Sequence, residues 1–129
     1  MSAHILIIED NEMSLALAEY LLRDAGYTVS SATDGGGGMR LALENNAHLI
    51  LCDLDLPVIE GSQLVQALRT SSDWRKVPVL AFTAASISDE QRQMLAADFD
   101  GYIIKPVDPA GFAASIGRHL AAGLSVSQG

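Results

Sequence analysis

The chain has 129 residues, 49% of them apolar, which suits one domain with a single sizeable core and is short for two domains. Eight basic and sixteen acidic residues give a net charge of −8, which repels nucleic-acid backbones and anionic membrane surfaces and argues against both as direct partners. The lone Cys52 excludes an internal disulfide, and because no signal-sequence pattern or membrane-length apolar stretch occurs, we expect a soluble cytoplasmic protein.

Short apolar runs along the chain predict β-strands. Most of these runs are continuous rather than alternating, as expected for strands that are covered on both faces, and the stretches between them have helical spacing. This alternation predicts an α/β fold, a doubly wound five-stranded parallel sheet with helices on both faces. The expected strands are residues 5–8, 27–32, 49–52, 77–82 and 101–104.

The first helix is the clearest of the predicted helices. It should begin near Asn11 and end before Gly26, a residue suited to a left-handed stop. Its apolar spacing predicts that the side chains buried against the sheet are Leu17, Tyr20 and Leu21.

The second and third helices have weaker signals. The second is expected over residues 39–46, after Asp34 and four glycines, and its first turn should be loose because each helical glycine costs about 1 kcal/mol relative to Ala. The third presents Leu64, Val65 and Leu68, and should break at the polar residues 70–73.

The last two helices have clear starting signals. The fourth, over residues 88–97, has Ser88 and Gln91 spaced as a capping box, with Met94 and Leu95 facing inward. The fifth is expected over residues 109–122, with Asp108 as N-cap, Pro109 in the first helical position and a buried stripe of Phe112, Ile116 and Leu120. We expect one domain over residues 1–122 and a flexible tail over 123–129.

Polar residues follow several of the predicted strands at the point where each strand ends. Glu9 and Asp10 follow the first strand, Asp53 the third, Thr83 the fourth and Lys105 the fifth. The carboxyl ends of parallel strands share one edge of the sheet, where ligands of doubly wound folds bind. We therefore expect these side chains to meet.

Three converging carboxylates would need a cation. At about 4 Å each pair repels by roughly 4 kcal/mol at an effective dielectric of 20. An oxygen-only set favours Mg²⁺, whereas zinc would want His or Cys ligands, and the three histidines have no ligand spacing with Cys52.

Each of these residues also has an ordinary structural interpretation. Acids favour helix starts, and an Asp commonly opens a turn after a strand. Thr83 could be an ordinary strand residue, and Lys105 a surface lysine at a turn before Pro106, whose preceding peptide bond is a candidate for the cis state. The convergence of all of them at one edge is what favours a site for a metal and a phosphoryl group.

Four segments of the chain resemble the receiver domain of bacterial two-component response regulators. They are Ile-Ile-Glu-Asp-Asn-Glu at 7–12, Leu-Cys-Asp-Leu-Asp-Leu-Pro-Val-Ile-Glu-Gly at 51–61, Pro-Val-Leu-Ala-Phe-Thr-Ala at 78–84 and Gly-Tyr-Ile-Ile-Lys-Pro at 101–106. The likeness extends from Ile5 to Leu120. It implies a flavodoxin-like sheet with strand order 2-1-3-4-5.

The resemblance assigns a role to each site residue. It makes Asp53 the phosphoacceptor, with Thr83 and Lys105 contacting the phosphoryl oxygens. It gives Mg²⁺ four protein ligands, namely Glu9, Asp10, Asp53 and the backbone carbonyl of Asp55. It makes Tyr102 the aromatic that swings inward when Thr83 moves, although an ordinary strand tyrosine remains the alternative.

The same resemblance implies a signalling function. The donor would be a phosphohistidine on a histidine kinase or a histidine phosphotransfer protein. The chain would not be an enzyme in the usual sense but would assist its own phosphorylation and autodephosphorylation. The switching surface would be the fourth helix, fifth strand and fifth helix, through which the family can also form a homodimer, and the sequence names no downstream partner.

Two rival functions remain open. Asp53-Leu54-Asp55 also resembles the nucleophile motif of haloacid dehalogenase-type phosphatases, in which Asp55 would be the general acid. That interpretation leaves Glu9 and Asp10 unexplained, and the chain is short for that fold. The other rival is a docking module that keeps the fold without phosphorylation, which the full set of acids, Thr83 and Lys105 disfavours.

Overall fold

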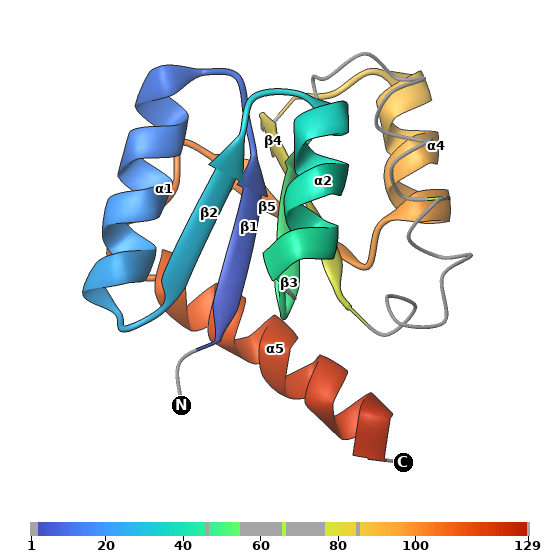
Figure 1. Ribbon diagram of the computed structural model, residues 1–129. Helices are drawn as coiled ribbons and strands as arrows, with labels where there is room; N and C mark the ends of the chain where they lie inside the picture. Colours follow the sequence, from blue (N-terminus) through green and yellow to red (C-terminus); the bar gives the residue numbers. More distant parts are fainter. Residues whose placement is uncertain (1–2, 46, 55–65, 67–76, 85, 129) are drawn as a thin grey trace.

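The computed structural model describes residues 3–45, 47–54, 66, 77–84 and 86–128. Five parallel strands form one sheet in the order β2-β1-β3-β4-β5, which confirms the predicted fold (Figure 1). The strands are β1 (His4–Ile8), β2 (Thr28–Ala32), β3 (Leu49–Asp53), β4 (Val79–Ala84) and β5 (Gly101–Lys105). The helices are α1 (Glu12–Asp24), α2 (Gly35–Asn45), α4 (Asp89–Asp98) and α5 (Phe112–Gln128). The third predicted helix, with Leu64, Val65 and Leu68, lies outside the described residues.

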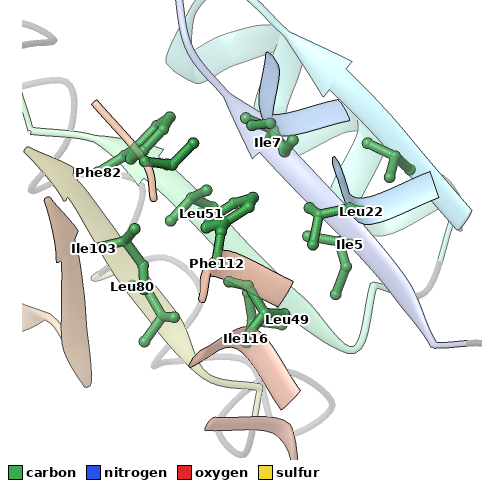
Figure 2. Close-up of a cluster of buried hydrophobic side chains, with 13 residues drawn as sticks. Ile5, Ile7, Leu22, Leu49, Leu51, Leu80, Phe82, Ile103, Phe112 and Ile116 are labelled. Carbon is green, nitrogen blue, oxygen red and sulfur yellow. The ribbon is translucent and has the colours of Figure 1, made fainter. Parts of the chain in front are cut away.

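Helices cover the sheet on both faces, and this explains why the sequence of β1 is continuously apolar. Ile5 and Ile7 point into the core shared with α1 and α5, whereas Leu6 and Ile8 point into the core that Leu41 of α2 covers. Figure 2 shows the first of these clusters, in which side chains of the central strands meet α1 and α5. Every residue of the run is therefore buried, and no polar face is left.

The predicted buried face of α1 was partly wrong. The helix begins after Asn11, whose Oδ1 accepts a hydrogen bond from Ser14 N at 2.9 Å, and Gly26 has the expected left-handed φ of 101°. Leu21 packs against the core as predicted, but Leu17 and Tyr20 are 36% and 66% exposed. The buried stripe runs instead through Ala18 and Leu22. The small Ala18 side chain lets the helix lie close to the sheet, which turns the bulkier residues outward.

The second helix begins earlier than predicted. α2 starts at Gly35, so the glycines that were expected to precede it form its first turn. Asp34 stabilises this turn, because its Oδ1 accepts a hydrogen bond from Gly37 N at 2.7 Å and its carbonyl accepts one from Gly38 N at 3.0 Å. A Cβ on Gly38 would lie 2.4 Å from Ile8 Cδ1, so glycine permits the close approach of α2 to β1.

The predicted capping box of α4 is confirmed. Ser88 Oγ accepts a hydrogen bond from Gln91 N, and Gln91 Oε1 accepts one from Ser88 N, both at 3.1 Å. Met94 is buried and Leu95 packs beside it, as predicted. In the described ranges, no helix is both long and apolar enough to cross a membrane.

The ends of α5 differ from the prediction. Asp108 Oδ1 accepts a hydrogen bond from Ala110 N at 3.2 Å, so the residues that follow Asp108 form a turn. The helix therefore begins only at Phe112. The predicted stripe is confirmed, with Phe112 and Ile116 buried and Leu120 partly so. The helix continues to Gln128 where a frayed tail was expected, because one glycine, Gly123, costs only about 1 kcal/mol inside a run that also holds good helix formers. The domain range 1–122 stays a prediction.

Candidate functional site

The parallel register brings the predicted polar residues to one edge of the sheet. Glu9 extends β1, because its backbone N–H donates to Ala32 O at 2.9 Å. Asp53 ends β3, the central strand, and pairs in register with Phe82 of β4. Lys105 ends β5 opposite Ala84, so it arrives at the same edge two strands away. The expectation that distant strand ends converge is therefore correct.

Three carboxylates form a compact cluster at this edge. Glu9, Asp10 and Asp53 each place one oxygen within 4.8 Å of the other two. Glu9 and Asp53 are buried, whereas Asp10 is exposed, so the cluster opens to solvent on the Asp10 side. A buried pair of acids with one exposed acid can receive a cation that keeps part of its water shell.

Lys105 bridges the two buried acids. Its Nζ lies 2.9 Å from Glu9 Oε1 and 3.3 Å from Asp53 Oδ1. Burial by itself lowers the pKa of Lys105, but the hydrogen bond with Glu9 and the charges of Asp53 and Glu9 outweigh this effect, so the pKa is raised. The lysine therefore stays protonated and supplies one positive charge to the acidic cluster. The peptide bond that joins it to Pro106 is cis.

The surroundings of Glu9 do not satisfy its buried carboxylate. Burial, with a further contribution from the neighbouring Asp53 carboxylate, raises its pKa to about 7, although Lys105 opposes the shift. Its Oε2 is buried without a hydrogen-bond partner among the described residues. Buried polar atoms without a partner are rare in proteins, and an all-oxygen set of this kind fits a hard divalent cation such as Mg²⁺.

Thr83 and Tyr102 belong to neighbouring strands and border the same cavity. Thr83 is buried on β4, and its Oγ1 donates to the carbonyl of Ala84 at 3.2 Å. Tyr102 on β5 is 52% exposed. Both residues line a cavity of about 380 Å³, together with Ala84, Ser86, Ile87, Arg92, Leu95 and Ile104. The Tyr102 side chain thus has space on the Thr83 side into which it can turn.

Sequence reasoning missed Phe82. It was assigned only to a strand, but its ring lies beneath Lys105, with Nζ 5.1 Å from the ring centroid. An aromatic residue directly before Thr83, in a strand adjacent to the one that ends in a lysine, was the available signal. Asp55, whose carbonyl was predicted to bind the metal, lies outside the described residues.

Sequence comparisons agree with this site. The family profile for the response regulator receiver domain matches residues 5–116. Among curated proteins, the polar-differentiation response regulator DivK of Brucella ovis is 29% identical over 120 residues, which cover 93% of this chain and 98% of DivK.

Solved structures with the same fold include two informative neighbours. The chemotaxis response regulator CheY4 of Vibrio cholerae superposes with a TM-score of 0.81 and 26% identity, covering 92% of this chain and 99% of CheY4. The receiver domain of the sensor histidine kinase PA1611 from Pseudomonas aeruginosa superposes with a TM-score of 0.82 and 30% identity, covering 94% and 99% of the two chains. That neighbour holds a magnesium ion coordinated in its active-site cleft.

Proposed function

Because this chain belongs to the response regulator receiver domain family, we propose that it signals by accepting a phosphoryl group on Asp53. The observation that carries the proposal is the position of this carboxylate. Asp53 ends the central strand, is 3% exposed, accepts a hydrogen bond from Lys105 at 3.3 Å and shares the acidic cluster with Glu9 and Asp10. Asp53 therefore meets both a cation-binding set and a fixed ammonium, and unlike Glu9, which shares both, it ends the central strand of the sheet.

We assign the metal site to Glu9, Asp10 and Asp53, with the backbone carbonyl of Asp55 as a further ligand. The orphaned Glu9 Oε2 and the all-oxygen donor set support Mg²⁺ as the ion. When bound, Mg²⁺ supplies positive charge that offsets the carboxylates and the incoming phosphoryl oxygens. The ammonium of Lys105, which donates to Glu9 and Asp53, supplies further positive charge.

The proposed transfer requires little covalent chemistry from the protein. An Asp53 oxygen forms the new O–P bond while the N–P bond of a donor phosphohistidine breaks and its electron pair returns to the imidazole. Lys105 and the Thr83 hydroxyl then hold the phosphoryl oxygens, so catalysis is mainly placement and charge compensation. We propose that water later cleaves the aspartyl phosphate in the same open site, which makes the signal transient.

Thr83 and Tyr102 supply the proposed switch. Thr83 must release the Ala84 carbonyl to donate its hydroxyl to a phosphoryl oxygen, and this movement changes the wall of the cavity that Tyr102 also lines. Tyr102 then turns from solvent toward Thr83. The turning of Tyr102 changes the surface formed by α4, β5 and α5. A downstream protein or a second copy of the chain can then bind this surface.

The proposed donor is a histidine kinase or a histidine phosphotransfer protein. An apolar surface of this chain lies beside the site, where the donor can bind it. Met13, which is 84% exposed, and Leu17 line a groove of about 380 Å³ there, together with Phe82, Lys105, Pro106 and Val107. Exposed apolar patches of this kind mark protein contacts. We also propose that the chain acts in the cytoplasm.

The phosphatase alternative is not favoured. The receiver-domain profile covers residues 5–116, and the buried Glu9 belongs to the acidic cluster, which the phosphatase reading left unexplained. Its general acid, Asp55, lies outside the described residues. Rapid multiple turnover of small phosphomonoesters, lost in Asp55→Asn, would revive that alternative.

The decisive experiment is phosphorylation with acetyl phosphate and Mg²⁺, followed on phosphate-affinity gels and by intact mass. Wild type should gain one alkali-labile phosphoryl group, and Asp53→Asn should gain none. Asp34→Asn is a matched control, because Asp34 is an exposed acid at the start of α2 rather than in the cluster. Equal labelling of the Asp53 variant would reject the assignment.

A further inference from the structure

The aromatic residue beneath the site lysine is held on two sides. Phe82 is 1% exposed and pairs in register with Asp53 of β3 on one side and with Ile103 of β5 on the other. Its ring stacks on Phe112 of α5, with centroids 6.4 Å apart and ring planes 17° apart, and both residues are labelled in Figure 2. The ring is therefore fixed by packing before Lys105 is considered.

The Lys105 ammonium sits over this fixed ring. Its Nζ is 5.1 Å from the Phe82 centroid, inside the distance of about 6 Å at which an aromatic face attracts a cation. An ammonium has three N–H donors, and two point to Glu9 Oε1 and Asp53 Oδ1. The ring attracts the charge without offering a lone pair, so it does not compete with a carboxylate or a phosphoryl oxygen for a hydrogen bond.

We propose that Phe82 is a positioning residue for the phosphoryl transfer, in which its ring face holds the Lys105 ammonium over the Asp53 carboxylate. The inference rests on the proposed function, since Lys105 matters here as the partner of the acceptor and of the phosphoryl oxygens. An aliphatic residue of similar size would fill the same space in β4 but would not attract the charge. The ring electrons, rather than the volume of the side chain, are therefore the property to be tested.

The aromatic pair also connects the site with α5 through side-chain contacts. Phe112 opens α5, and its ring supports Phe82 from the core side. Lys105, Phe82 and Phe112 thus form one column from the acidic cluster to the start of that helix. This route is distinct from the one through Thr83 and Tyr102, because it acts on the resting position of the lysine.

The test replaces Phe82 in the 129-residue chain with mono-, di- and trifluorophenylalanine. These analogues reduce the negative charge on the ring face stepwise and keep nearly the same size. The initial rate of Asp53 phosphorylation by acetyl phosphate should fall progressively, by about 3- to 10-fold across the series. The same series at Phe99, a partly buried ring that packs against the cores beneath α2 and α4, is the matched control and should leave the rate unchanged.

A second measurement needs neither metal nor phosphorylation. In the free protein, the Lys105 Hε protons should be shifted upfield in NMR spectra by the ring current of Phe82, and Phe82→Leu should remove this shift while far-UV circular dichroism reports an intact fold. In a Lys105→Ala background, fluorination at position 82 should no longer alter the rate.

The two measurements separate the possible failures. A flat rate across the fluorinated series, with wild type still labelled on Asp53, would overturn the positioning role. If wild type takes up no phosphoryl group at all, the proposed function fails, and the NMR shift alone decides whether the lysine rests on the ring. Absence of that shift would overturn the inference in either case.

Discussion

Glu9 should make the stability of this protein fall with rising pH, against the usual behaviour of a paired acid. Its pKa is raised from 4.5 to about 7 in the folded state, first by burial and then by Asp53. Between these two pH values the folded protein binds more protons than the unfolded chain, so the free energy of unfolding decreases as pH rises. The stabilising contribution is complete below pH 4.5 and is lost above about pH 7.

The structure gives the size of this effect. One pKa unit corresponds to about 1.36 kcal/mol, so a shift from 4.5 to about 7 corresponds to on the order of 3 kcal/mol. Glu9→Gln keeps the shape of the side chain and cannot ionise. The variant should therefore lack this loss, and its advantage over wild type should grow by that amount across the interval.

Urea unfolding followed by circular dichroism, from pH 4 to pH 8 with EDTA present, measures the difference directly. Millimolar Mg²⁺ should shrink the gap above pH 7, because a cation compensates the ionised Glu9 only in wild type. Glu44→Gln, at an exposed position in α2, is the control and should show no such trend. A wild-type to Glu9→Gln gap that stays constant with pH would refute the reasoning about burial.

Three further predictions address the packing, the lysine and the switch. Gly38→Ala should lower the free energy of unfolding, measured in urea, by about 1–3 kcal/mol, because its Cβ would lie 2.4 Å from Ile8 Cδ1. Gly36→Ala is the matched variant and should raise the free energy of unfolding by up to about 1 kcal/mol, since its Cβ meets nothing nearer than 3.7 Å. Equal effects of the two substitutions would contradict this prediction. Lys105→Met should bind Mg²⁺ more tightly in calorimetry yet label Asp53 about 100-fold more slowly with acetyl phosphate, and unchanged labelling would exclude the proposed role. Fluorotyrosine at Tyr102 should show a new ¹⁹F NMR position when beryllofluoride is added, and an unmoved signal would argue against its turning toward Thr83.

The sequence predicted the sheet and the site for the same physical reason. A run such as Ile5 to Ile8 can be satisfied only by burial on both faces, which requires helices on both sides and a parallel sheet. Once the strands are parallel, their carboxyl ends share an edge. The meeting of Glu9, Asp53 and Lys105 then follows from the position of each residue at the end of a parallel strand rather than from any local preference.

What the sequence did not predict depends on how closely the elements approach. α1 contains apolar residues on more than one stripe, and the small Ala18, rather than the bulky Tyr20, marks the side that packs against the sheet. The glycines of α2 were expected to precede the helix because single-residue propensity says nothing of Ile8, which needs the space beside Gly38. The same limit hid Phe82, whose contact with Lys105 joins two strands.

The charges at the site explain why Lys105 should have opposite effects on metal binding and on transfer. In the resting state its Nζ bonds both Glu9 and Asp53, so it competes with a cation for those carboxylates. Phosphorylation replaces the single charge of Asp53 with a group that carries about two negative charges. The ammonium then gains a stronger partner, and its attraction to the resting acids becomes attraction to the phosphoryl oxygens. The resting ion pair is therefore the cost of having the ammonium already in place when the phosphoryl group arrives.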